Sequence, residues 1–490
     1  MPIQEAWDVT GRGPISSRWI DLDKGDMNKP NYRSRLVIQE VRHSGIDAIF
    51  AATPPLESLR FLLSLQRSLS SKKKYKIMFV DIRRAHWTAK IHRSVYVRLP
   101  PGVLPEGYCG RLNKAMYGCR DAASCWEAEI TDCLTSCGFV PGLGSPVLFV
   151  HPGRDLRVSI HGDDLTTLGV ESDLLWFKAK LEERYELKFG GLMGPDVHDV
   201  KNAMILNRLV HYDDDETTYE ADPRHVQILI RALNLEQAKA VSTPGVSRNP
   251  DRGPELSGEQ LKHYRSLCMR CNYLALDRPD ISYSAKELAR AMSKPCSADW
   301  ESLKRLTRYL VGNPRLLWVY KTQLEPVELV MYSDSDDGGC ATTRKSTSAG
   351  ALMHGSHLIK FYSGTQHTIA LSSGESEYYA GLRAGSTLLG CVSMAKDLGV
   401  DRMAVLAFDS SAAKAMLTRK GFGRAKHIHR SYLWLQQRVQ ENELTLRKVG
   451  TKVNGADLGT KYLDGYRIAE LISLLSLVIA AKEHDLALHV

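Results

Sequence analysis

The stretch "SIHGDDLTTLG" (residues 159–169) carries two adjacent aspartates, Asp163 and Asp164, directly after a glycine. Apolar residues recur on both sides of the pair, and glycine suits a tight bend between two strands. The pattern therefore predicts a β-hairpin with two negative charges at its tip. Adjacent carboxylates repel each other unless a cation neutralises them, which makes the tip a candidate metal site. For this stretch taken alone, a simple polar turn is the alternative.

The apolar run "KIMFVDI" (residues 76–82) predicts a buried strand, and Asp81 stands near its end. A carboxylate at a strand end is held rigidly and can point into a cleft. Magnesium accepts carboxylate oxygens and keeps positions open for substrate phosphates. Two such ions ~4 Å apart can activate an attacking hydroxyl and stabilise the leaving oxygen of an in-line displacement. We therefore expect Asp81, Asp163 and Asp164 to form a metal platform for phosphoryl transfer.

A second set of carboxylates follows in the C-terminal half of the chain. Asp334 ends the strand-like run "VELVMYSD", and Asp409 ends "AVLAFD". Glu377 lies near the start of a long helix expected over about residues 374–398, and Asp457 precedes a late helical turn. Carboxylates at strand ends and helix starts suit a site that holds two magnesium ions for phosphodiester cleavage. For each residue alone, a solvated charge or a helix cap is the alternative.

The start of the long helix offers two glutamates, of which only one can face the strand ends. Successive helix positions are about 100° apart, so Glu375 and Glu377 point in nearly opposite directions. Ser372 and Glu375 have the S-x-x-E spacing of a capping box. This spacing assigns Glu375 to the cap and Glu377 to the metal site.

The composition indicates a folded chain of several domains. A length of 490 residues exceeds one ordinary core, so two or three domains are expected. The formal net charge of +9 favours an anionic partner such as nucleic acid. The spacing of the ten cysteines does not match a zinc finger, and reduced cysteines in an intracellular protein are expected.

The periodicity predicts three regions of different character. The N-terminal part mixes strands and helices, residues 255–312 are mainly helical, and a strand-rich pattern begins at Glu328. In this last region three strands precede alternating helices and strands, which describes a second α/β domain. The apolar segment "RIAELISLLSLVIAAK" (residues 467–482) predicts an amphipathic helix too short to span a membrane.

Several motifs occur in an order typical of one family. They are "FVDIRRAHW" (79–87), "RLNKAMYGCRDAASCW" (111–126), "IHGDDLTTLG" (160–169), "YSDSD" (332–336), "ALSSGESEYYA" (370–380) and "GADLGTKYL" (455–463). In these motifs the chain resembles the reverse transcriptase and ribonuclease H portions of copia-type LTR retrotransposon Pol polyproteins. The resemblance extends from about Trp19 to Leu463.

The resemblance implies an α/β and α+β multidomain fold, in which a right-hand polymerase with fingers, palm and thumb precedes an RNase H-like domain. The expected parts are a partial N-terminal lead-in over residues 1–30, fingers, palm and the start of the thumb over 31–245, a mainly helical thumb and connection over 246–325, the RNase H-like domain over 326–464, and an apolar helical tail over 465–490.

The resemblance also implies a role for each candidate site residue. Two magnesium ions, or manganese in their place, would be bound for DNA synthesis by Asp81, Asp163 and Asp164. Two more would be bound for cleavage of the RNA strand of a hybrid by Asp334, Glu377, Asp409 and Asp457.

Other residues are implied in binding substrates. Arg33 and Arg35 would contact the incoming triphosphate, and His86 occupies the position at which the family usually has an aromatic residue that excludes the 2′-hydroxyl. Arg344 and Lys345 would contact the hybrid backbone, with a polar hairpin turn as the alternative.

The expected activity is RNA-directed DNA synthesis with ribonuclease H activity. The expected partners are an RNA template, a DNA primer, an RNA–DNA hybrid and deoxynucleoside triphosphates. No membrane partner is expected, and a homodimer stays open. Relatives of this kind act in cytoplasmic particles and deliver DNA to the nucleus, so either location is expected. The alternative is a catalytically inactive or truncated element-derived protein that only binds nucleic acid.

Overall fold

The computed structural model describes residues 1–23, 25, 30–41, 51–70, 73–247, 252–423 and 425–481. The chain forms two compact units. The first unit comprises Met1–Leu62, Lys74–Gly194 and Asp397–Gly399, and the second comprises Leu63–Lys73, Pro195–Lys396 and Val400–Val490. The division at Gly194 falls inside the segment expected for fingers, palm and thumb. The assignment of those parts by residue range stays a prediction.

A small four-stranded sheet lies in the first unit, with the strand order β2-β1-β4-β5. Its elements are β1 (Ile15–Asp23), β2 (Tyr32–Ile38), β4 (Tyr96–Arg98) and β5 (Gly110–Arg111), and helix α1 (Ile3–Thr10) precedes them. Residues 1–30 were expected to be a lead-in, yet β1 is an interior strand of this sheet and pairs with both β2 and β4.

The larger sheet of the first unit has six strands in the order β10-β3-β9-β8-β7-β6. The strands are β3 (Tyr75–Ile82), β6 (Val140–Pro141), β7 (Leu148–His151), β8 (Leu156–His161), β9 (Asp164–Val170) and β10 (Leu187–Met193). The accompanying helices are α3 (Ala85–Thr88), α4 (Ala122–Ser136) and α5 (Glu171–Glu182), whereas α2 (Leu56–Leu69) begins in the first unit and ends in the second. The predicted strand over 76–82 and the predicted hairpin at 159–169 are both confirmed.

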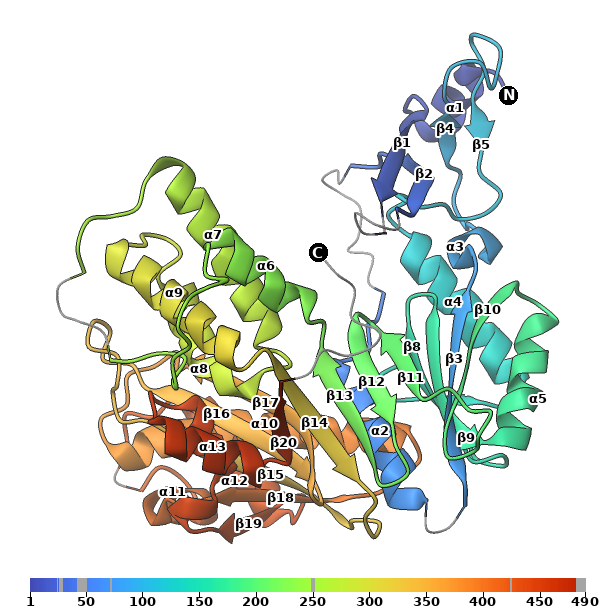
Figure 1. The fold of residues 1–490 in the computed structure, drawn as a ribbon. Helices are drawn as coiled ribbons and strands as arrows, with labels where there is room; N and C mark the ends of the chain where they lie inside the picture. Colours follow the sequence, from blue (N-terminus) through green and yellow to red (C-terminus); the bar gives the residue numbers. More distant parts are fainter. Residues whose placement is uncertain are drawn as a thin grey trace. The chain divides into compact units, whose positions relative to one another are not determined.

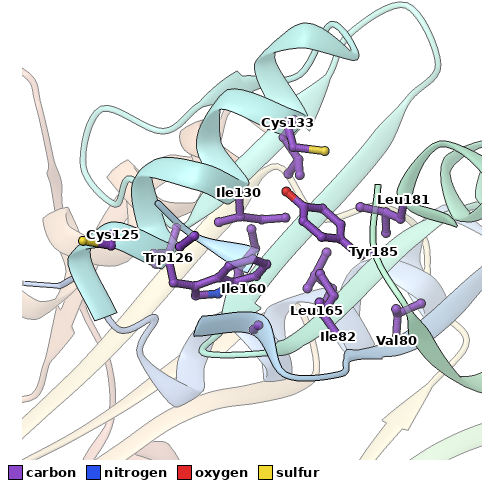
Figure 2. Packing of buried hydrophobic residues seen from close by; sticks show 14 of the residues in the cluster. Val80, Ile82, Cys125, Trp126, Ile130, Cys133, Ile160, Leu165, Leu181 and Tyr185 are labelled. Atoms are coloured by element: carbon purple, nitrogen blue, oxygen red, sulfur yellow. The ribbon is translucent and has the colours of Figure 1, made fainter. Parts of the chain in front are cut away.

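Apolar side chains of α4 and α5 form one buried core with this sheet. Figure 2 shows Trp126 and Ile130 of α4 beside Ile160 of β8 and Leu165 of β9. These residues are at most 3% exposed. The two strands of the hairpin, β8 and β9, are therefore packed against helix α4.

The second unit contains a five-stranded sheet in the order β11-β12-β13-β14-β20 and a group of four helices. The strands are β11 (Asn202–Ile205), β12 (Arg208–Tyr212), β13 (Glu216–Ala221), β14 (Arg315–Lys321) and β20 (Leu477–Ala480). The helices are α6 (Arg224–Ala232), α7 (Gly258–Leu274), α8 (Pro279–Arg290) and α9 (Ser297–Gly312), and they share one apolar core. This confirms the mainly helical segment.

A second five-stranded sheet in the same unit has the order β17-β16-β15-β18-β19. The strands are β15 (Glu328–Ser335), β16 (Thr347–His354), β17 (His357–Thr365), β18 (Met403–Phe408) and β19 (Thr445–Lys448). Strands β15, β16 and β17 are antiparallel, whereas β18 and β19 run parallel to β15. The predicted order of three strands followed by helices and strands is confirmed (Figure 1).

The helices associated with this sheet include the predicted long one. They are α10 (Ser373–Asp397), α11 (Ser411–Thr418), the 3₁₀ turn η1 (Arg430–Leu433), α12 (Trp434–Gln440), the 3₁₀ turns η2 (Thr451–Val453) and η3 (Gly455–Gly459), and α13 (Gly465–Leu474). None of the described helices is long and apolar enough to cross a membrane.

The expected helix over 467–482 is wrong in its second half. Helix α13 ends at Leu474, Ser476 adopts a left-handed φ of 55°, and β20 then pairs antiparallel with β14. The run Leu477–Ala480 is short and contains two β-branched residues, which suits a strand as well as a helix. The rest of the expected tail, residues 482–490, lies outside the described residues.

Candidate active sites

The hairpin at residues 159–169 forms because Gly162 turns the chain between two buried strands. Gly162 has a φ of 65°, a left-handed conformation that disfavours other residues. An added Cβ would meet nothing within 4 Å, so backbone conformation and not space selects glycine here. Gly162 and Asp163 separate β8 from β9, and the flanking His161 and Asp164 are paired across the strands. Both aspartates are half-buried at the tip.

The register of the sheet places Asp81 next to this tip. Asp81 of β3 pairs with Asp164 of β9. The amide of Ile82 donates a hydrogen bond of 2.9 Å to the carbonyl oxygen of Asp163, which ties the turn to the end of β3. The structure thus brings Asp81, Asp163 and Asp164 to one edge of the sheet, as the sequence predicts.

A tryptophan holds the turn from the other side. Trp126 of α4 is 3% exposed, and its Nε1 donates a hydrogen bond of 2.7 Å to the carbonyl oxygen of Gly162. Nothing in the sequence marks Trp126 as part of the site, because its place in an apolar helical pattern indicates only the core. The turn is therefore fixed by α4 as well as by β3.

The carboxylates of Asp81, Asp163 and Asp164 are less tightly grouped than the second predicted set, which is described below. Among the described residues, no set of three potential ligands within 4.8 Å of one another includes Asp81, Asp163 or Asp164. Their oxygens are of the type that magnesium prefers, and a spread arrangement leaves room for phosphate oxygens as further ligands. The residues present therefore fit a magnesium site completed by substrate.

Two of the side chains expected to bind the nucleotide, Arg35 and His86, are connected to this edge through Tyr117. Arg33 and Arg35 are exposed on β2, and residues two apart on a strand share a face. The guanidinium of Arg35 lies 5.1 Å from the centre of the Tyr117 ring, and that ring meets the edge of the His86 ring at 5.1 Å between centres. Burial lowers the pKa of His86, although the nearby Asp163 opposes the shift. Tyr117 was not singled out from the sequence.

The second site lies where β15, β18 and α10 meet. Parallel strands end at the same edge of a sheet, and the pairing of Tyr332 with Ala407 aligns the ends of β15 and β18. The structure brings carboxylate oxygens of Asp334, Glu377 and Asp409 within 4.8 Å of one another. Oxygen ligands at this spacing fit a divalent hard cation.

The electrostatics of this carboxylate cluster (Asp334, Glu377 and Asp409) show what a cation would change. Burial, together with the neighbouring Asp457 and Asp409, raises the pKa of Asp334 to about 7, although a hydrogen bond from Thr460 opposes the shift. Burial and the same cluster raise the pKa of Glu377 to about 9. The buried Oε2 of Glu377 has no hydrogen-bond partner among the described residues. Three close carboxylates with few donors around them are a set that a cation stabilises.

The fourth expected carboxylate, Asp457 in η3, stands beside this cluster without belonging to the 4.8 Å group. Its two oxygens are 2.7 Å from Nζ of Lys461 and 3.3 Å from the guanidinium of Arg467. It acts on the pKa of Asp334 through charge. Its partners are thus two cationic side chains, Lys461 shortly after η3 and Arg467 of α13.

Two threonines orient the ligands, and both were missed in the sequence. Thr460 Oγ1 donates to Oδ2 of Asp334 at 2.8 Å, and Thr451 Oγ1 donates to Oδ2 of Asp409 at 2.6 Å. The motif "GADLGTKYL" contains Thr460, but no spacing rule connects it to a strand more than a hundred residues earlier.

The two glutamates at the start of α10 divide as predicted. Glu377 joins the cluster, whereas Glu375 caps the helix and accepts a hydrogen bond of 3.2 Å from the amide of Leu371. Glu375 also accepts bonds from Tyr379 Oη at 2.6 Å and from the imidazole of His427 at 2.9 Å.

Arg344 and Lys345 lie in a tight turn between β15 and β16. Arg344 has a φ of 57°, and its amide donates to the carbonyl oxygen of Cys340 at 2.7 Å. The polar turn, offered as the alternative, is present. A contact of these side chains with nucleic acid stays a prediction.

The fold is that of a multidomain polymerase of the reverse transcriptase class. Residues 5–208 match the family described as reverse transcriptase (RNA-dependent DNA polymerase). The foamy viral protease-reverse transcriptase, solved in complex with RNA/DNA hybrid, is similar with a TM-score of 0.50 and 13% identity, covering 89% of this chain and 50% of that chain. At this identity the likeness shows the fold alone.

Curated relatives extend the match beyond the first unit. The retrovirus-related Pol polyprotein from transposon RE2 of Arabidopsis thaliana is 27% identical over 93% of this chain and 32% of its own length. The Pol polyprotein from transposon TNT 1-94 of Nicotiana tabacum is 24% identical over 92% of this chain and 35% of its own length. Residues 5–208 thus match the reverse transcriptase family, and over 93% of its length the chain is similar to copia-type retrotransposon Pol polyproteins. It spans about a third of the length of these relatives.

Proposed function

We propose that the chain is an RNA-directed DNA polymerase that also cleaves the RNA strand of RNA–DNA hybrids. The family match over residues 5–208 supports the polymerase activity, together with the carboxylates at the ends of β3 and β9. The close grouping of Asp334, Glu377 and Asp409 carries the proposal of a hydrolytic site. The similar foamy viral protease-reverse transcriptase was solved in complex with RNA/DNA hybrid, which agrees with an RNA template, a DNA primer and a hybrid as partners.

At the first site the side chains position the reactants. The primer 3′-oxygen forms a bond to the α-phosphorus of the incoming nucleotide, and pyrophosphate leaves. Asp81, Asp163 and Asp164 would hold magnesium, which supplies charge neutralisation and a more acidic hydroxyl when bound. The hydrogen bonds from Trp126 and Ile82 keep the turn fixed while the primer end approaches. Arg35 can neutralise triphosphate charge, and Tyr117 holds its guanidinium in place.

At the second site the side chains would hold the metal ions that act on the RNA strand. Asp334, Glu377 and Asp409 would bind magnesium, whose charge keeps them ionised despite burial. Thr460 and Thr451 fix the carboxylate orientation. Water adds to the phosphorus, the ribose 3′-oxygen leaves, and the products carry a 5′-phosphate and a 3′-hydroxyl.

The experiment is primer extension on an RNA template with magnesium, beside the double variant Asp163→Asn, Asp164→Asn. Extension by the parent alone would support the polymerase. Hybrid cleavage is measured in parallel with Asp334→Asn, which should remove cleavage and leave extension intact. No extension and no cleavage by a parent that still binds hybrid would support the alternative, an inactive nucleic-acid-binding protein.

A further inference from the structure

A cavity in the second unit lies on a face of α10 that Glu377 does not share. Its volume is about 670 Å³, and α10 contributes Tyr379 and Arg383 to its lining. Glu377 precedes Tyr379 by two positions, or about 200° around the helix. The cavity also contains Tyr432 and Trp434, and we call it the aromatic cavity. Its volume is in the range of small-ligand sites.

The aromatic walls are held in place by contacts that leave ring surface accessible. The Tyr379 and Tyr432 rings are 5.3 Å apart between centres and inclined by 65°. The hydroxyl of Tyr379 donates to Glu375, which His427 contacts at 2.9 Å. These bonds anchor the ring by its polar end, so that its sides remain for packing.

Cationic side chains line this cavity and its neighbour. A neighbouring cavity of about 600 Å³, the basic cavity, shares Trp434 and is lined by Lys420 and Arg430. In the aromatic cavity the guanidinium of Arg383 lies 4.2 Å from the centre of the Tyr362 ring. Within the described part of the chain, none of these three cations forms an ion pair, and no carboxylate lines either cavity.

We propose that the aromatic and basic cavities together bind unpaired nucleotides of a single nucleic-acid strand. Bases stack inside the aromatic cavity, and the phosphates between them meet the cations. Proteins that bind single strands combine stacking rings with a positive groove in this way. A paired base is enclosed in its duplex and cannot enter a cavity of this size. The site is separate from the carboxylate cluster and needs no metal.

Cross-linking tests where the strand binds. The full chain in EDTA is irradiated with single-stranded oligonucleotides that carry bromouridine or bromodeoxyuridine, and the modified peptides are identified. The RNA and DNA arms show which strand is preferred. We expect adducts on Tyr432 or Trp434 with unpaired strands and none with a blunt hybrid. Equal adducts with the blunt hybrid, or adducts only in the first unit, would overturn the proposal.

The affinity of variants for a single strand distinguishes the contribution of ring stacking from effects on folding. Trp434→Ala and Tyr432→Ala should weaken single-strand binding by about 5- to 150-fold, because each base stack is of that size. Tyr432→Phe keeps the ring and should bind like the parent. Tyr466→Ala is the matched control, since Tyr466 is 77% exposed in α13.

A pair of exposed cations provides a second variant that does not threaten folding. Lys420→Gln with Arg430→Gln should weaken binding and lower its salt dependence. Parent-like binding by this variant and by Trp434→Ala would refute the site. Displacement of the strand by poly-glutamate as effectively as by oligouridylate would indicate an acidic peptide as the ligand and also refute it. None of these readouts depends on either catalytic activity.

Discussion

Replacing Glu377 by glutamine keeps the size of the side chain and removes one charge from the carboxylate cluster. In the folded chain without metal, burial and the neighbouring carboxylates raise the pKa of Glu377 from its ordinary 4.5 to about 9. The folded state therefore holds a proton that the unfolded state has released. Stability from this group is fully present below about pH 4.5 and is lost as the pH rises towards 9.

The size of the effect follows from the interval between the ordinary pKa of 4.5 and the raised pKa of about 9. Each pH unit inside the window lowers the free energy of unfolding by at most about 1.4 kcal/mol per group. Between about pH 6 and about pH 8, the parent should lose up to about 3 kcal/mol that Glu377→Gln retains. Asp334 titrates in the same cluster, so the measured value belongs to the coupled set rather than to one residue.

Hydrogen exchange of peptides from β15 and β18 reports this local stability, because Asp334 lies in β15 and Asp409 directly follows β18. The measurement is made in EDTA and repeated with magnesium, which should flatten the pH dependence of the parent. Glu236→Gln, at an exposed position of the same unit, is the control. Parallel pH dependence of parent and Glu377→Gln in EDTA would refute the reasoning.

Three further variants test the contacts around the sites. Gly162→Ala places a side chain at a φ of 65° with nothing in its way, so it should destabilise the hairpin by about 1–2 kcal/mol through backbone strain alone, measured as faster hydrogen exchange in β8 and β9. Trp126→Phe removes the hydrogen bond to Gly162 and should lower the free energy of unfolding of the first unit by about 1–3 kcal/mol. It should also slow primer extension. An unchanged extension rate would show that the turn does not need this hydrogen bond. Thr460→Val removes the donor to Asp334, which raises the pKa of that carboxyl further, so hybrid cleavage should require a higher pH; the pH–rate profile decides.

The sequence predicted the elements that carry the carboxylates, because each is a local pattern. The apolar runs before Asp81, Asp334 and Asp409 are strands, and the glycine before Asp163 marks the turn. The capping spacing separated Glu375 from Glu377 correctly.

Contacts between distant segments could not be predicted in this way. Thr460 reaches Asp334, and Trp126 reaches Gly162, only once the sheets have formed. The sequence predicts helix over the C-terminal strand because Ser476, not a glycine, adopts the left-handed conformation that follows α13. A serine carries no strong signal of a helix end.

The position of β20 has a consequence for the order in which the second unit can fold. Strand β14 pairs with β13 on one side and with β20 on the other, and β20 follows it only after the whole β15–β19 sheet and its helices. During synthesis β14 therefore remains an unpaired edge while most of the second unit leaves the ribosome. An open edge of this kind recruits strands from other chains. Removal of β20 would leave this edge of β14 open in the finished protein as well and should thus promote its aggregation, although both carboxylate sites would be intact in sequence.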